Sequence, residues 1–536
     1  MKYRLPGSVP GVLAVIGVIL FISIHFVAPM LGDKNSQDEL GETKPGLTAA
    51  QASEKALAWA GARPDGYGLS PIVTQDTHKL WAGYVQKNDF WPRYEKEYKH
   101  IYPMDYYRIE LMDSLGKVRY ILEMDMDSGE IFGWRASYRL NSPNNPELRR
   151  SGEAAARAEL ARHNIDLASY TLLPEGTSVY NFIYQHREDQ LGQAPRQIGV
   201  AIIGSQVVAY QNRFDVPPDH RNWQNKQDDA AERMSLISLV LSFLMGLVAI
   251  GYAIRARKHV SFSRGLLFTL SYLLLNGITV LNMYPATRIM AGDFPGSAEI
   301  AGFMIFNLLL TLGLTVQLYF ALVAGDGMKR TEGWSLWPRW NNPDFGGHVF
   351  DSMKRGYLIC LFALGLQALL FLIGENVFHT WAIGDPTMSV NNMLWPLAFP
   401  SLAWVAAISE EAVFRLFGIL LFKKMLRVDF LAVLFPSMIW ALSHTTYPIY
   451  PAYTRFVEVT ILGIVFGYAF LKYGFFTAVF AHAAMDSILM GLSLAVSRQD
   501  AASVIVAFVS IASPAWVAWI ISRLHRHSQF RRAHTS

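Results

Sequence analysis

The chain places a small group of charged residues inside a run that is otherwise apolar from Leu394 to Phe422. Two adjacent carboxylates, Glu410 and Glu411, are followed by Arg415. An ionisable side chain at the depth of a lipid bilayer is energetically costly, and by default it marks a functional site. We therefore place the centre of a candidate active site in this segment.

Helical spacing gives the two glutamates different surroundings. Glu411 and Arg415 stand at positions i and i+4, so they share a helix face and are expected to form an ion pair. Glu410 is rotated by about 100° from Glu411, and its own i+4 neighbour is Phe414. A desolvated carboxylate without a cation suits general acid–base chemistry. The alternative is a buried ion-pair network that only holds helices together.

Two later apolar runs each carry a histidine. His444 is the last residue of the segment Trp440–His444. A single histidine near a helix end is usually an interfacial residue. His482 and Asp486 are spaced i, i+4, so the carboxylate can accept from one ring nitrogen and fix the tautomer. Two histidines and a glutamate on neighbouring helices can also bind a metal, although the soluble zinc-protease pattern His-Glu-x-x-His is absent.

The composition indicates a membrane protein. Of 536 residues, 52% are hydrophobic and only 17% are charged, which is too apolar for a soluble chain of this length. The net charge of +4 is small and the basic residues lie between apolar runs, so nucleic-acid binding is not indicated. Cys360 is the single cysteine, which excludes a disulfide within the chain and a cysteine-based metal cluster.

About ten transmembrane helices are expected. Lys2 and Arg4 precede an apolar run from about Val9 to Leu31, which we interpret as an uncleaved anchor, with a cleaved signal peptide as the alternative. Nine more apolar runs follow Arg233. They lie near 234–254, 265–284, 299–324, 356–378, 394–422, 429–446, 456–471, 475–497 and 501–522.

The basic residues predict the orientation. Nineteen basic residues near the ends of the apolar runs lie on the same side as the N-terminus. The short loops on the other side hold only Arg288, Arg455 and Arg498. Because basic residues favour the cytoplasmic side, both termini are expected inside and region 33–232 outside. The resulting divisions are an anchor (1–32), an extracytoplasmic α+β domain (33–232), helices 2–4 (233–330), a cytoplasmic loop (331–355), a membrane core that holds all three polar groups (356–525) and a basic cytoplasmic tail (526–536).

The sequence pattern predicts two similar units in the extracytoplasmic domain. Each consists of a helix followed by an antiparallel meander, and the first opens with a capping box at Thr48 and Gln51. The expected helices are Gln51–Ala60 and, after Ser151, Glu153–Arg162. The expected strands are Trp81–Val85, Tyr106–Met112, Val118–Asp125, Ile131–Ala136, Ser178–Gln185, Gln197–Ile203 and Gln206–Gln211. This arrangement resembles tandem PepSY-like modules, mainly through the stretch Asp125–Ile131.

The polar groups of the membrane runs resemble the CPBP family of intramembrane proteases, which includes the type II CAAX prenyl endopeptidases. That family carries Glu-Glu-x-x-x-Arg, then Phe-x-x-x-His, then His-x-x-x-Asn or Asp, on successive helices. This chain reads Glu410-Glu411-x-x-x-Arg415, Trp440-x-x-x-His444 and His482-x-x-x-Asp486. Tryptophan in place of phenylalanine is expected to be a modest change in packing. The acidic residue at 486 matters more, because an ionised aspartate cannot donate a hydrogen bond to an oxyanion.

The resemblance implies hydrolysis of a peptide bond. Glu410 with His444 would activate a water, and His482, oriented by Asp486, would stabilise the oxyanion or bind the leaving side. The candidate catalytic residues are Glu410, Glu411, Arg415, His444, His482 and Asp486. We favour a mechanism without a cofactor; the alternative is a zinc enzyme with Glu410, His444 and His482 as ligands.

The expected partners are a peptide or protein substrate in or at the membrane and the lipid bilayer, with no nucleic acid. Two other classes of function stay open. One is a non-catalytic membrane scaffold or sensor, and the other is a transporter, because carboxylates within membranes also serve proton relays. The complete set of three motifs favours the protease.

Overall fold

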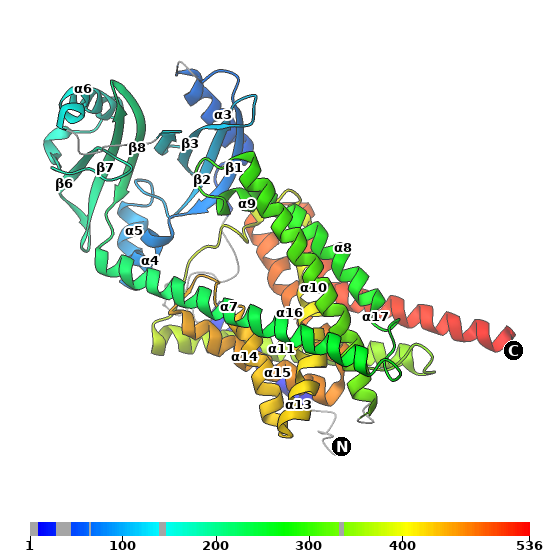
Figure 1. Cartoon of the computed structure of the whole chain (residues 1–536). Coiled ribbons are helices and arrows are strands. Elements are labelled where there is room, and N and C mark those ends of the chain that lie inside the picture. The colour runs from blue at the N-terminus through cyan, green and yellow to red at the C-terminus, as the bar shows by residue number, and fades with distance from the viewer. Residues whose placement is uncertain (1–8, 28–43, 64–65, 139–145, 332–336, 536) are drawn as a thin grey trace.

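The computed structural model describes residues 9–27, 44–63, 66–138, 146–331 and 337–535, so Lys2, Arg4 and the last residues of the predicted anchor lie outside the described residues. Two regions are evident: a sheet domain, and a bundle of long helices below and beside it (Figure 1). The α+β character that the sequence predicts for the first region is confirmed.

One antiparallel sheet of eight strands runs through the sheet domain in the order β1-β2-β3-β4-β8-β7-β6-β5. The two units meet where β4 pairs with β8, with Gly133 opposite Gln211. Helices α3 (Ala49–Gly61) and α6 (Pro146–Arg162) supply buried alanine and leucine side chains to one core with the sheet. The strands are β1 (Ser70–Thr77), β2 (Asp105–Met112), β3 (Val118–Asp125), β4 (Ile131–Ala136), β5 (Tyr170–Leu172), β6 (Phe182–Leu191), β7 (Ala194–Ile203) and β8 (Gln206–Phe214).

Most expected elements of this domain are present, and the Thr48–Gln51 capping box is confirmed. The strand predicted at Trp81–Val85 is wrong, because these residues lie in helix α4 (Lys79–Lys87). All five are buried, and an unbroken buried run does not distinguish a strand from a helix by its periodicity. The second helix also starts before Ser151, at Pro146. The PepSY-like resemblance is not confirmed and stays a prediction.

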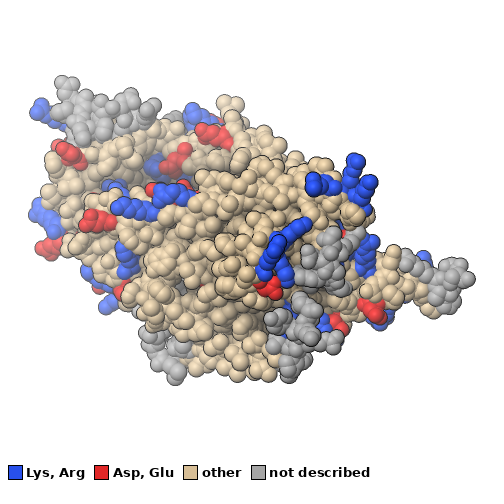
Figure 2. Space-filling model, turned by 60° about the horizontal axis from the view of Figure 1, so that its bottom comes forward, with Lys and Arg blue, Asp and Glu red and all other residues tan. Residues whose placement is uncertain are grey.

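Among the described residues, six helices are long and apolar enough to cross a membrane, or seven if the pair α8 (Leu266–Asn282) and α9 (Tyr284–Met290), bent by 58°, counts as one span. The chain is therefore a multi-pass integral membrane protein. Figure 2 shows a broad face of the bundle that is almost free of charged side chains. The six helices are α7 (Pro218–Arg255), α10 (Ser297–Thr331), α11 (Phe345–Phe378), α15 (Ala452–Tyr473), α16 (Phe475–Arg498) and α17 (Ala501–Thr535).

The expected number of about ten spans is not confirmed. Helices α1 (Val9–Ile22) and α14 (Asp429–Leu442) have only 14 residues each. The run 394–422 is not one helix, because backbone geometry changes along it while hydropathy does not. It comprises η4 (Pro396–Ser401, a 3-10 helix), α12 (Leu402–Glu410), η5 (Glu411–Ile419, a π-helix) and the start of α13 (Leu420–Leu426).

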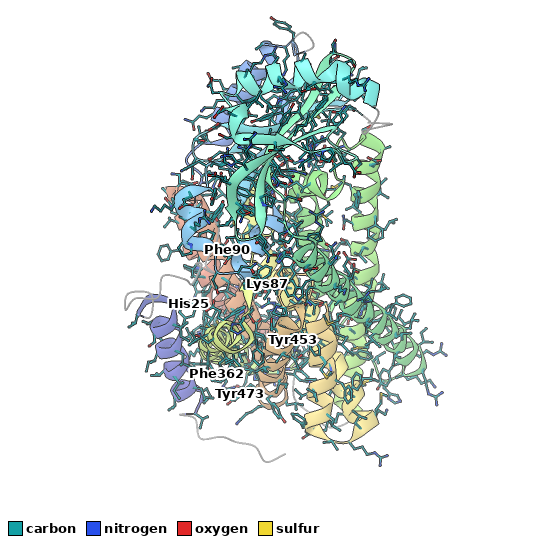
Figure 3. All side chains as sticks on the ribbon, turned by 90° about the vertical axis from the view of Figure 1, so that its left-hand side faces the viewer. His25, Lys87, Phe90, Phe362, Tyr453 and Tyr473 are labelled. Carbon is teal, nitrogen blue, oxygen red and sulfur yellow. The ribbon has the colours of Figure 1, made fainter. Side chains whose placement is uncertain are left out.

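Helix α1 lies along one side of the bundle against α11 (Figure 3). Gly17 and Gly365 make this contact possible: a Cβ atom on Gly17 would stand 2.2 Å from the Leu361 carbonyl oxygen, and one on Gly365 would stand 2.1 Å from the Gly17 carbonyl oxygen. The described part of the first apolar run is thus packed against the bundle, and the uncleaved anchor stays a prediction.

Polar contacts fix the sheet domain to the bundle close to the candidate site. Arg288 of α9 donates to Glu110 of β2 from Nε at 2.8 Å and from Nη2 at 2.5 Å. The Asn392 side chain bonds to both backbone groups of Gln75 on the edge strand β1, at 2.7 Å each. Asn392 lies just before η4, so the sheet domain contacts the segment that leads into α12.

Helix α7 also links the two regions, since it begins at the end of the sheet domain and continues into the bundle. Its Asp228 accepts from Lys79 of α4 at 3.1 Å and from the Tyr450 hydroxyl at 2.6 Å. Tyr450 belongs to β10 (Ile449–Tyr450), which pairs with β9 (Trp381–Ala382). Figure 3 shows the Tyr453 end of α15 nearer to Lys87 of α4 than the Tyr473 end.

Candidate active site

Four of the six candidate site residues converge on one cavity of about 330 Å³ among α12, α14, α15 and α16. Glu410, His444, His482 and Asp486 all line it. The lining from α15 begins at Arg455 and ends at Phe466, so the cavity lies in the half of the bundle closer to the sheet domain. The remaining lining residues are Gln367, Leu402, Val405, Ala406, Ser409, Trp440, Tyr447, Arg455, Val459, Leu462, Phe466, Met485, Leu489 and Met490.

Behind the cavity, the predicted ion pair between Glu411 and Arg415 is present. Arg415 Nη1 lies 3.0 Å from Glu411 Oε1, and both side chains are fully buried. The guanidinium also lies 4.1 Å from the centre of the Trp440 ring. The pair opens the π-helix η5, a geometry that interrupts α-helices mainly at functional sites. The two glutamates therefore stand at the junction of α12 and η5.

His482 is held by carboxylates on both ring nitrogens. Nδ1 lies 2.8 Å from Glu411 Oε1, while Nε2 lies 3.3 Å from Asp486 Oδ2 and 3.8 Å from Glu410 Oε2. The ring stacks on Phe466 with 5.3 Å between centroids. The sequence predicts that Asp486 fixes the tautomer of His482. In the structure Glu411 lies closer to the ring than Asp486 does, on the opposite nitrogen. No sequence spacing links Glu411 to His482.

This geometry limits the protonation state of the His482 ring. An ionised carboxylate only accepts, so Nδ1 must carry the proton that bonds to Glu411. A neutral ring would then present its Nε2 lone pair to the carboxylates of Asp486 and Glu410. A proton on Nε2, or one shared with a facing carboxylate, removes that repulsion. His482 is thus arranged to direct an N–H donor toward the cavity.

His444 has a different environment. Its Nδ1 lies 2.9 Å from the carbonyl oxygen of Trp440, which can only accept, so Nδ1 carries the hydrogen. Nε2 of a neutral ring is then an acceptor at the cavity. The Ser443 hydroxyl donates to the same carbonyl at 2.7 Å. The end of α14 therefore presents one histidine in a defined tautomer, which is more than its position near a helix end suggested.

Trp440 does more than fill space. Its indole Nε1–H donates to Glu410 Oε2, a bond that phenylalanine cannot make. The expected modest change in packing is therefore wrong: the substitution adds a hydrogen-bond donor to the Glu410 carboxylate. The departure from the family pattern was visible in the sequence, but its partner was not, because 30 residues separate the two side chains.

The zinc alternative requires Glu410, His444 and His482 to surround one point. In the part of the chain that the structure describes, no group of three or more His, Cys, Asp or Glu side chains is arranged to hold a metal ion. His444 is also not among the side chains that contact His482 Nε2, whose neighbours are the two carboxylates. The present arrangement therefore does not fit a preformed three-ligand site.

Comparisons with known proteins agree with this location. Residues 392–488 match the family described as type II CAAX prenyl endopeptidase Rce1-like. The chain is 20% identical over 310 residues to the sporulation-killing factor biosynthesis protein SkfC of Bacillus subtilis (strain 168), which covers 57% of this chain and 60% of that protein. The match thus spans less than two thirds of the relative's length. No solved structure matches this chain. Residues 392–488, which contain all six candidate site residues, are similar to an Rce1-like CAAX protease domain within an integral membrane protein.

Proposed function

We propose that the chain is an intramembrane endopeptidase in which Glu410 and His444 activate a water for attack on a peptide carbonyl. The observation that carries this proposal is the convergence of Glu410, His444 and His482 on one cavity. Glu411 is neutralised by Arg415, whereas in the described part of the chain Glu410 forms an ion-pair contact with His482 and none with a guanidinium group. A general base and its helper need this combination of a free carboxylate and a neutral imidazole within reach of one water.

In the first step, the water oxygen bonds to the carbonyl carbon while the water proton passes to Glu410. The Nε2 acceptor of His444 is available to orient the same water. The carbonyl oxygen becomes an oxyanion, which a donor from His482 Nε2 would stabilise. Glu411 and Asp486 act as positioning residues, because both contact the imidazole ring at hydrogen-bond or near hydrogen-bond distance.

In the second step, the oxyanion collapses and the carbon–nitrogen bond breaks. The leaving amine takes a proton that Glu410 received from the water, so the base ends in its starting state. No cofactor is required by this sequence of steps. The cavity is lined by apolar side chains together with several polar groups, so it suits a peptide segment with apolar side chains whose amide is held at the polar groups.

The substrate is proposed to be a membrane-associated peptide or protein. The relative from Bacillus subtilis is named for the biosynthesis of a sporulation-killing factor, and a hydrolase that matures a precursor would fit a biosynthetic role of this kind. We further propose that both termini are cytoplasmic and that region 33–232 is extracytoplasmic, on the basic-residue asymmetry alone.

Substrate trapping tests the proposal. The Glu410→Gln variant should bind but not cleave its substrate, so native membranes containing this variant should enrich a precursor that mass spectrometry identifies, while wild type yields its two fragments. A non-catalytic scaffold or sensor would capture the same uncleaved partners with wild type and with variant. That outcome would contradict the protease.

A further inference from the structure

We propose that Trp440 is a positioning residue for the base, holding one oxygen of Glu410 so that the other faces the water. This inference rests on the proposed function for its consequence in catalysis, but its structural part stands alone. The indole Nε1–H donates to Glu410 Oε2. In the described part of the chain no hydrogen bond reaches Oε1 of the same carboxylate, and the side chain is 24% exposed at the cavity.

The indole ring itself is held from several sides. Trp440 is only 4% exposed. Its face covers the Arg415 guanidinium at 4.1 Å, and the His482 ring meets it edge-on with centroids 5.7 Å apart. Gly463 of α15 provides the space for this packing, because a Cβ there would stand 3.1 Å from Trp440 Cε3. A ring fixed in this way can aim its N–H at one carboxylate oxygen.

The same residue also orients the second member of the water-activating pair. The backbone carbonyl of Trp440 accepts from His444 Nδ1 at 2.9 Å, so the main chain fixes the tautomer of His444 while the side chain fixes the rotamer of Glu410. The two groups that must reach one water are thereby tied to a single residue. A phenylalanine at this position would keep the main-chain bond and lose only the bond to the carboxylate.

The sharpest test removes the N–H and nothing else. Genetic incorporation of β-(3-benzothienyl)alanine at position 440 replaces the indole nitrogen with sulfur and keeps the shape of the side chain. Trp404 on α12 offers a matched control, because its Nε1 donates to Ser513 Oγ at 2.9 Å and it does not line the cavity. The same replacement at position 404 should therefore leave the reaction unchanged.

Two readouts on the purified full-length protein separate positioning from stability. The first is hydrolysis of an internally quenched pool of synthetic dodecapeptides, with thermal unfolding measured in parallel. Loss of the donor at position 440 should lower kcat by about tenfold or more, as expected for a misplaced general base, with KM within about twofold. The melting temperature should equal that of the variant at position 404.

The second readout needs no activity. Dicyclohexylcarbodiimide reacts with protonated carboxyl groups in apolar surroundings, and a donated hydrogen bond stabilises the ionised form. Labelling of Glu410, followed by mass spectrometry, should therefore be several-fold faster in the variant at position 440 than in wild type. Loss of the label in the Glu410→Gln variant would show that Glu410 is the labelled residue.

The outcomes are distinguishable. If wild type does not hydrolyse the pool, the proposed function fails, and the labelling rate alone then decides the role of Trp440. Unchanged labelling overturns the inference. Where wild type is active, unchanged kcat in the variant at position 440 also overturns it, whereas slower turnover with faster labelling supports it.

Discussion

Two regions of the molecule gather clusters of charge, the junction between the sheet domain and the bundle and the cavity within the bundle, and the balance of charge differs between them. At the junction, three carboxylates pair with three guanidinium groups. The members are Glu110, Glu123 and Asp293 with Arg108, Arg135 and Arg288. In the described part of the bundle, the carboxylates of Glu410, Glu411 and Asp486 form ion pairs with Arg415 and the His482 ring.

The balance shows what each cluster can do. Charges that are fully paired across a junction hold its two sides together and leave no group for chemistry. A cluster with one carboxylate in excess keeps that group poised to exchange a proton, provided that it faces a space where a reactant can bind. In the bundle, the excess lies at Glu410, beside the cavity.

Breaking the ion pair of the membrane cluster should have the largest effect. Arg415→Ala removes the cation of Glu411, and Glu411→Gln strands Arg415 and takes a partner from His482. Each leaves an uncompensated buried charge, which costs about 3–5 kcal/mol. We expect both variants to lose activity and to fall in abundance in membranes, as measured by quantitative immunoblotting. Glu375→Gln, which removes an exposed carboxylate from α11, is the control. Normal abundance of both variants would contradict the structural role of the pair.

Two substitutions of Asp486 should show whether its role depends on accepting a hydrogen bond or on its charge. Asp486→Asn keeps an acceptor for His482 Nε2 through its amide oxygen, so it should retain substantial activity. Asp486→Leu removes the acceptor and should lower kcat by ~10²-fold, the scale of a general-catalysis contribution. Steady-state kinetics of the two purified variants checks this expectation. Equal activities in the two variants would show that Asp486 does not act through His482.

The Glu123 carboxylate, which is the sheet-domain end of the junction cluster, leads to a smaller prediction that concerns the stability of the fold alone. Burial acts to raise the pKa of Glu123, but the neighbouring His78, Arg135 and Gln211 hold it at about 2. Because this pKa lies below the usual value of an unfolded glutamate, the contribution to stability is present above about pH 4.5 and is lost as pH falls toward 2. Its size is on the order of 3 kcal/mol.

Thermal unfolding of wild type and Glu123→Gln at pH 7 and pH 3 measures this contribution in the full chain. The variant should melt lower than wild type at pH 7, and the difference should shrink at pH 3, while hydrolysis at pH 7 below the melting transition stays near normal. A difference in melting temperature that is independent of pH would show that the Glu123 charge does not stabilise the fold.

Metal removal should have the smallest effect. In the proposed mechanism, a strong chelator leaves purified wild type active, because Glu410 acts directly on the water. Metal analysis accompanies the assay. About one equivalent of tightly held zinc, with activity that chelation removes and zinc restores, would make Glu410, His444 and His482 ligands and would overturn the role of Glu410 as the base.

The sequence predicts those features that depend on near neighbours. The Thr48–Gln51 capping box and the pairing of Glu411 with Arg415 are both set by local spacing. The contact of Glu411 with His482 spans 71 residues and has no such signature. Trp440 was visible as an unusual residue, but its role depends on the approach of α12 and α14. The division of the run 394–422 was also hidden, since a π-helix and an α-helix have the same hydropathy.

The most direct measurement of the central claim is hydrolysis by two variants in which adjacent glutamates are replaced one at a time. Glu410→Gln should abolish cleavage of the trapped substrate while the protein stays near normal abundance, because the ion-pair contact of this carboxylate, to His482 Nε2, is long at 3.8 Å. Glu411→Gln should reduce abundance as well as cleavage. If purified Glu410→Gln cleaves the substrate at the rate of wild type, then Glu410 is not the base and the proposed mechanism is contradicted.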